Sequence, residues 1–190
     1  MTPGNGPLRI LGVEDGSFDA FNRKAPGHTI LCGALMKGDK IIKVRHAEIR
    51  VDGLDATDKL LSLMRGIEVD AVILGGITFG GFNVINPRII HAETGVPIIV
   101  YSGVKPDNDA VLAALRKHFP DWERRWKIIA GLGEIHSTRV FREDPEIYFE
   151  VIGCDPGWAE GVLRDSAMIS RIPEPVRVAG LVARGLTRVY

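Results

Sequence analysis

Hydrophobic residues in the first quarter of the chain form short apolar runs that are separated by polar turns. The run in residues 8–15 (LRILGVED) ends abruptly on two carboxylates, which predicts a buried strand with an acidic end. Residues 28–38 and 39–51 predict two further strands, and the KGD segment at 37–39 between them is a hairpin signal. The sequence therefore predicts an antiparallel meander of three strands.

The rest of the chain alternates between helical spacing and short apolar strands. Residues 55–66 repeat apolar positions at helical intervals and stop at Gly66, which is typical of a helix with a glycine at its end. Beyond this helix the pattern predicts strands in 70–76, 96–102, 137–141 and 147–153, and helices in 85–95, 108–119, 120–133, 156–169 and 173–186.

This order of elements indicates the fold class. Continuous apolar strands between helices favour parallel pairing with both faces of the sheet covered. A three-stranded meander followed by such crossovers is the connectivity of the ribonuclease H-like fold, an α/β fold with a mixed sheet. We expect a single domain over residues 8–190, preceded by a disordered N-terminus at 1–7.

Composition narrows the class of protein. The 190 residues are 45% hydrophobic, which suits one domain with a substantial core. The 24 Lys and Arg residues balance 24 Asp and Glu residues, so no global charge directs the protein to nucleic acid or membrane. The apolar runs are too short to span a bilayer, and the two cysteines, Cys32 and Cys154, have no metal-site spacing. These features predict a cytoplasmic protein without membrane association.

Three polar stretches are expected to converge at one edge of the sheet. The first is Glu14-Asp15-Gly16, at the end of the opening strand, and the second is VDGLDATD, which carries Asp52, Asp55 and Asp58. The third is the glycine-rich segment at 75–83 (GGITFGGFN), which follows the strand at 70–76. Open α/β sheets place ligands at the carboxyl ends of adjacent parallel strands, so we expect acids and bare backbone to share a pocket.

Carboxylates at such a junction suit a hard divalent cation. Mg²⁺ or Mn²⁺ takes oxygen ligands and activates water against a phosphodiester, which makes Asp15, Asp52 and Asp55 candidate metal ligands and catalytic residues. A glycine loop lets backbone N–H groups approach a phosphate. The candidate substrate-binding residues are Gly75, Gly76, Thr78, Gly80, Gly81, Phe82 and Asn83. Taken singly, each acidic cluster also fits a turn or a helix cap.

Several stretches resemble a known family. LGVEDGSF, IRVDGLDAT, DAVILGGITFGGFN with the following PRII, GVPIIVYSG and RIPEPVRVAGLVARGL resemble the archaeal domain-of-unknown-function family ninety-nine. That family is similar to endonuclease V. The resemblance implies an endonuclease V-like, ribonuclease H-like fold and a metal-dependent nuclease that cuts DNA or RNA near deaminated purines, chiefly inosine.

The resemblance also assigns positions in the metal site. The acid on the first strand of endonuclease V matches Asp15, and the acid before the first helix matches Asp55 or, as the alternative, Asp52. The third acid falls on Gly75 and the fourth polar position on Gly180, and neither glycine can bind a metal through a side chain. Asp52 is the candidate substitute for the missing carboxylate.

Three functions follow from these residues. The first is a divergent Mg²⁺-dependent nuclease that acts on phosphodiester bonds of DNA or RNA. The second is a catalytically degenerate protein that binds nucleic acid or a nucleotide without cutting it. The third is an enzyme that acts on a small phosphorylated metabolite.

Overall fold

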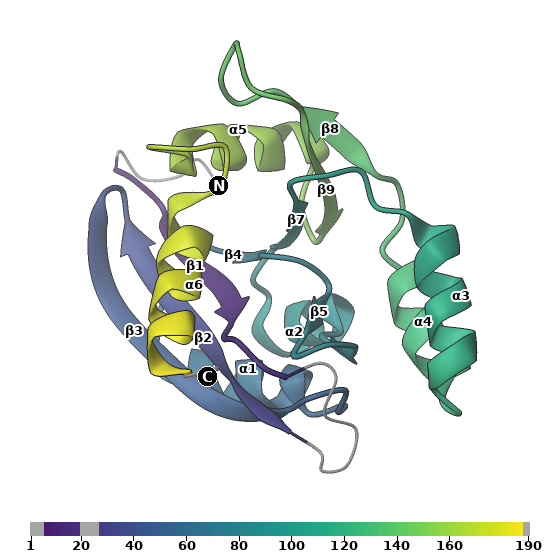
Figure 1. The fold of residues 1–190 in the computed structure, drawn as a ribbon. Helices are drawn as coiled ribbons and strands as arrows, with labels where there is room; N and C mark the ends of the chain where they lie inside the picture. Colours follow the sequence, from purple (N-terminus) through teal and green to yellow (C-terminus); the bar gives the residue numbers. More distant parts are fainter. Residues whose placement is uncertain (1–5, 20–26, 188–190) are drawn as a thin grey trace.

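The computed structural model describes residues 6–19 and 27–187, which fold around a seven-stranded sheet (Figure 1). The strand order across the sheet is β3-β2-β1-β4-β7-β9-β8. The strands are β1 (Arg9–Asp15), β2 (His28–Lys37), β3 (Lys40–Arg50), β4 (Ala71–Leu74), β7 (Ile98–Ser102), β8 (His136–Thr138) and β9 (Ile147–Ile152).

The first three strands form the expected antiparallel meander, with a tight turn at Gly38 and Asp39 between β2 and β3. Strand β1 then pairs in parallel with β4, and β4 pairs in parallel with β7. This mixed sheet confirms the fold class that the sequence predicts. Strand β9 pairs antiparallel with β7, and β8 completes that side of the sheet.

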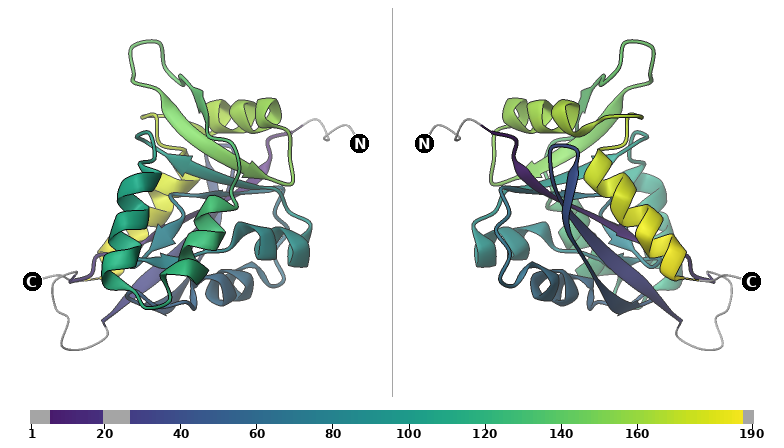
Figure 2. Two further views of the ribbon diagram at one scale, coloured as in Figure 1. Left: turned by 90° about the vertical axis from the view of Figure 1, so that its right-hand side faces the viewer. Right: turned by 90° about the vertical axis from the view of Figure 1, so that its left-hand side faces the viewer.

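Helices cover both faces of the sheet, because the central strands are apolar on both sides. Figure 2 shows α6 on the face opposite α1 and α2, while α3 and α4 lie beside the sheet as an antiparallel pair. One core cluster joins the sheet to α1 and α2, and two others join it to α5 and α6. The helices are α1 (Ala56–Met64), α2 (Pro87–Thr94), α3 (Asn108–His118), α4 (Trp122–Ala130), α5 (Pro156–Ser166) and α6 (Glu174–Leu186).

Helix α6 lies very close to β1. A Cβ atom on Gly12 would overlap the backbone of Pro175 and Val176, so the first turn of α6 packs directly on the strand backbone. This contact matters for the site, because the following turns of α6 are thereby held over the acidic end of β1.

The glycine-rich segment contains two short strands, which the sequence pattern did not predict. It forms a small hairpin of β5 (Thr78–Phe79) and β6 (Asn83–Val84), which we call the glycine hairpin (residues 78–84). Its turn contains Gly80 and Gly81 with φ angles of 52° and 83°, which glycine adopts without strain.

Other details concern the chain ends and the thiols. Residues 1–5 of the expected disordered N-terminus lie outside the described residues. Cys32 is buried and Cys154 is half-buried, and both are free thiols. In residues 6–19 and 27–187, no helix is both long and apolar enough to cross a bilayer.

Candidate functional site

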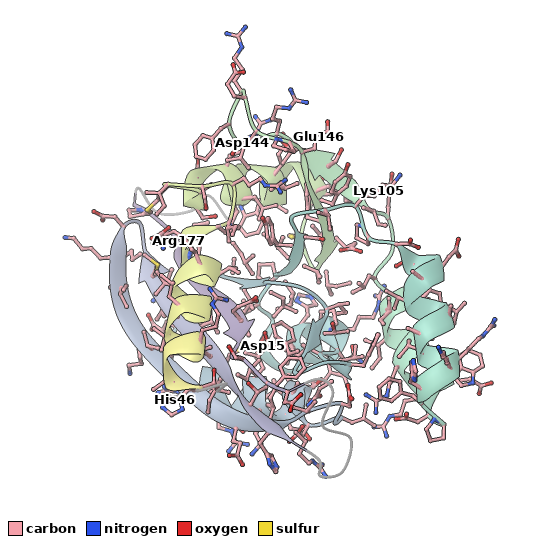
Figure 3. The ribbon with its side chains drawn as sticks, in the orientation of Figure 1. Asp15, His46, Lys105, Asp144, Glu146 and Arg177 are labelled. Carbon is pink, nitrogen blue, oxygen red and sulfur yellow. The ribbon has the colours of Figure 1, made fainter. Side chains whose placement is uncertain are left out.

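The carboxyl ends of β1, β4 and β7 lie side by side, because these three strands are parallel neighbours. The ladder pairs Val13 with Leu74 and Leu74 with Val100, and the Gly75 N–H continues it by donating to the Val13 carbonyl at 2.9 Å. Glu14 and Gly75 are therefore neighbours just beyond the paired region. Figure 3 labels Asp15 at the end of β1, near the middle of the molecule.

Asp15 is bound to the turn of the glycine hairpin. Its Oδ2 atom accepts a hydrogen bond from the backbone N–H of Gly80. Burial raises the pKa of Asp15 above its usual range, although the Gly80 N–H and the positive charge of Arg184 both act to lower it. The expected meeting of the opening strand with the glycine-rich segment is thus present in the structure.

Asp52 is bound to the same hairpin from the other side. Its Oδ1 accepts from the Phe82 N–H at 2.8 Å, and its own backbone N–H donates to the Gly80 carbonyl at 2.7 Å. Asp52 has a left-handed φ of 58°, which Asp and Asn tolerate better than most residues. This exposed residue therefore holds the hairpin in place.

Asp55 is bound to Asn83 at the end of the hairpin. Its Oδ1 accepts from the Asn83 side-chain amide at 2.7 Å and from the Arg50 backbone N–H at 3.3 Å. Asn83 is fully buried, and its side chain also accepts from the Ala56 N–H and donates to the Arg50 carbonyl. The three candidate acids thus bind three successive parts of the glycine hairpin.

Arg125 joins this arrangement to helix α4, and it was not among the site residues predicted from the sequence. The side chain is buried and donates to the carbonyls of Asp52, Gly53 and Phe82 at distances of 2.6–3.0 Å. It also pairs with Asp121 at 3.0 Å. The sequence does contain a pattern that indicates this role. Arg125 lies on the same face of the helix as the apolar residue Ile129, so it is expected to be buried, and a buried charged side chain needs hydrogen-bond partners.

Glu14 lies on the other face of β1, under helix α6. Its carboxylate occupies the space where a side chain at Gly75 would begin, and its Cγ would be 2.9 Å from a Cβ atom on Gly180. Burial and the neighbouring charge of Asp15 raise the pKa of Glu14 to about 8, whereas Arg184 acts to lower it. Glu14 therefore occupies the space next to Gly75 and Gly180, which have no side chains. This position of Glu14 was not predicted from the sequence.

Tyr101, at the end of β7, belongs to the same side of the site. Burial raises the pKa of its hydroxyl, the Arg171 charge lowers it, and the Glu14 charge raises it further. A Cβ atom on Gly103 would be 3.3 Å from the Tyr101 hydroxyl and 3.9 Å from an Arg171 nitrogen. Glu14 thus lies near the Tyr101 phenol and the charge of Arg184, while Arg171 lies on the far side of Tyr101 toward Gly103.

The candidate acids are not grouped in the way that the expected metal site requires. Among the described residues, no three His, Cys, Asp or Glu side chains are grouped so that they could hold a metal ion, so Asp15, Asp52 and Asp55 do not form such a group. Glu14 and Asp15 are sequence neighbours, and the charge of Asp15 helps to raise the pKa of Glu14. The two side chains point to opposite faces of β1, so each face offers one carboxylate, and one carboxylate completed by water and substrate phosphate is a known ligand set for Mg²⁺.

Solved structures share this architecture. A protein of unknown function from Archaeoglobus fulgidus is 34% identical, covers 96% of this chain and 99% of its own, and superposes with a TM-score of 0.83. Human ENDOV superposes with a TM-score of 0.63 at 16% identity, over 95% of this chain and 84% of its own. Endonuclease V of Ciona intestinalis, in complex with inosine-containing DNA, superposes with a TM-score of 0.61 at 11% identity, over 94% and 85%. The expected likeness to the endonuclease V fold is therefore confirmed.

Sequence relatives cover nearly the whole chain. A UPF0215 protein of Thermococcus gammatolerans is 36% identical over 93% of this chain and 90% of its own length. Another UPF0215 protein, from Methanopyrus kandleri, is 35% identical over 95% and 92%. The sequence model of endonuclease dU matches residues 7–187. This match covers the whole sheet and the acidic end of β1. The chain therefore belongs to the endonuclease dU family.

Proposed function

We propose that this protein is a divalent-metal-dependent endonuclease that cuts phosphodiester bonds in DNA, with deoxyuridine as the feature that it recognises. The name of the family supports the choice of substrate. The observation that carries the proposal is the half-buried pair of Glu14 and Asp15, whose pKa values are raised, at the junction of three parallel strand ends.

In this proposal Glu14 would hold the cation, because it supplies the carboxylate that position 75 lacks. Asp15, on the opposite face of β1, would hold the glycine hairpin beside it and add negative charge near Glu14. When bound, the cation would activate water and neutralise charge on the phosphodiester. Arg184 contributes positive charge near Glu14, where it would orient a phosphate, and Arg171 contributes positive charge near Tyr101.

Asp52 and Asp55 have a different role in this proposal. Because their carboxylates bind the Phe82 N–H and the Asn83 amide, they position the glycine hairpin, and metal binding by either acid would require these bonds to open. Gly75, Gly76, Thr78, Gly81 and Phe82 remain the proposed substrate-facing residues, whereas Gly80, whose N–H is bound to Asp15, and Asn83 are buried.

Cleavage of end-labelled DNA tests the proposal. Single strands and duplexes that carry one deoxyuridine, one inosine or no modification are incubated with Mg²⁺, with Mn²⁺ or with EDTA. We expect metal-dependent cutting of the deoxyuridine strand, and a loss of at least about 100-fold in Glu14→Gln and Asp15→Asn, since each removes a charge at the site of reaction.

Asp109→Asn is the matched control, because Asp109 is an exposed acid in the first turn of α3. It should cut like the wild type. Undiminished cutting by both Glu14→Gln and Asp15→Asn would refute the proposed site.

A binding protein without cleavage activity is the second candidate. It is favoured by the hydrogen bonds that occupy Asp15, Asp52 and Asp55, together with the lack of a three-acid group among the described residues. Tight binding of deoxyuridine-containing DNA without cutting under any metal condition would favour this function over the nuclease.

A further inference from the structure

A second feature at the same sheet edge is a basic hollow between α1, α2 and α4. Its volume is about 550 Å³. It is lined by Leu54, Thr57, Asp58, Val84, Asn86, Arg88, Ile89, Arg124, Lys127, Ile128 and Gly131. We call this feature the basic hollow, and of its lining only Val84, in the glycine hairpin, belongs to the site described above.

Three cations surround the hollow, against one acid, Asp58. Arg124 and Lys127 are exposed on α4 at a spacing of three residues, so both point to the same side of the helix. Within the described part of the chain, neither of them forms an ion pair. The chain as a whole has zero formal net charge, so this is a local excess of positive charge.

Arg88 closes one side of the hollow. Its Nε and Nη2 atoms donate to the Gly131 carbonyl at 3.0 and 2.6 Å, which fixes the guanidinium in place while the side chain stays exposed. The nearby start of α2 adds little, because the Asn86 side chain already accepts from the Arg88 and Ile89 N–H groups. The hollow therefore attracts anions through its side chains.

The hollow is continuous in sequence with the glycine hairpin. Leu54 and Val84 in its wall adjoin Asp55 and Asn83, which are bonded to each other at the end of the hairpin. A strand that reaches Asp15 on one side of the hairpin can thus extend over the hairpin to the cations of α4. A nucleic-acid strand carries regularly spaced phosphates, so it can contact both ends of this route at once.

We infer that the basic hollow binds a backbone phosphate of the substrate strand at a distance from the bond that is cut. This inference rests on the proposed function, since it assigns a second contact to the same nucleic-acid substrate. Arg88 provides a positive charge that is fixed in place by the Gly131 carbonyl, and Arg124 and Lys127 provide charge on flexible side chains.

The test measures binding without cleavage. Fluorescently labelled single strands with one deoxyuridine are titrated in EDTA, and anisotropy gives the affinity at several salt concentrations between 50 and 200 mM. For Arg124→Glu/Lys127→Glu we expect a loss of about 10-fold or more at the lowest salt. The slope of log K against log salt should become shallower by about 1.4, because each single-strand phosphate contact contributes about 0.7.

Lys40→Glu/Lys43→Glu is the matched control, with the same change of charge on exposed residues of β3. Figure 1 shows β3 and α4 on opposite sides of the view. This control should lose less than about twofold in affinity, since it changes net charge without changing the hollow. Arg124→Lys/Lys127→Arg should bind like the wild type, and thermal melting checks that all three variants fold.

The outcomes separate this inference from the proposed function. Equal affinity losses in the hollow and control variants would overturn the inference, as would a wild type that binds no DNA. Inorganic phosphate that raises the melting temperature while DNA does not bind would also overturn it, in favour of a small anion. Wild-type binding that depends on the hollow, without any cleavage, would support the inference and contradict only the nuclease.

Discussion

The carboxylate of Glu14 occupies the position above Gly75 where any side chain at residue 75 would begin. Parallel pairing of β1 with β4 causes this relationship, because Glu14 and Gly75 follow the paired residues Val13 and Leu74. The acid that is absent from the end of β4 is thus matched by an acid on the neighbouring strand.

Gly75→Ala should displace Glu14. The new methyl group would overlap the Glu14 carboxylate, which must move away from its buried position and become more hydrated. We expect the pKa of Glu14, about 8 in the wild type, to fall toward the usual range of glutamate. Carboxyl-carbon NMR titration measures this change.

Gly76→Ala is the control for this experiment. A Cβ atom on Gly76 would meet only the Thr78 carbonyl, at 3.9 Å, so there is room for a methyl group. An unchanged midpoint for Glu14 in Gly75→Ala would contradict the described packing.

Replacement of Arg125 should destabilise the protein strongly. Arg125→Met removes the donors to the Asp52, Gly53 and Phe82 carbonyls and leaves Asp121 without its partner. We expect the free energy of unfolding to fall by about 2–4 kcal/mol, measured by urea denaturation. Arg124→Met, at the exposed neighbouring position, should change it by less than about 0.5 kcal/mol.

Asp52→Asn distinguishes a hairpin anchor from a metal ligand. Asparagine keeps an oxygen that can accept from the Phe82 N–H and tolerates the left-handed backbone, so stability and cleavage should remain near wild-type values. Asp52→Ala loses the acceptor and is strained at a φ of 58°, so its melting temperature should fall by several degrees. A loss of cleavage in Asp52→Asn with normal melting would instead identify Asp52 as a metal ligand.

Glu150 should make the protein less stable as the pH rises. Burial raises its pKa to about 7 in the folded protein, whereas the unfolded chain ionises near the usual value of 4.5. Between these two values the folded state holds more protons than the unfolded state, so the free energy of unfolding falls as the pH increases. Glu150→Gln should not show this loss of stability. The difference between its melting temperature and that of the wild type should therefore increase from pH 4.5 to pH 8.

Glu143→Gln serves as the comparison, because Glu143 is exposed in the loop before β9. Its melting temperature should follow that of the wild type across the same range. A parallel pH dependence in Glu150→Gln would mean that Glu150 is ionised in the folded protein.

Sequence periodicity was sufficient for the order of the strands and helices, because that order depends on local patterns. Continuous apolar runs such as residues 71–74 mark strands that are covered on both faces, and the hairpin signal at 37–39 corresponds to the observed turn between β2 and β3. The parallel pairing of β1 with β4, on which the expected convergence of the polar stretches depends, is present. The resemblance correctly indicated the likeness to endonuclease V.

Only the tertiary structure decided how the acids are used. Asp15, Asp52 and Asp55 each bind the glycine hairpin instead of forming one group of three acids, and the contacts of each carboxylate depend on the conformation of that hairpin, which no periodicity encodes. The role of Glu14 depends on the register between two strands that are distant in sequence.

Contacts between residues distant in sequence also explain why the role of Arg125 and the basic hollow were not predicted. Arg125 contacts residues that lie 43 to 73 positions away in the chain. The sequence by itself determined which residue types were available and which strands they follow. Which of them meet was decided by long-range packing, because strand register and helix docking bring together side chains that no local pattern relates.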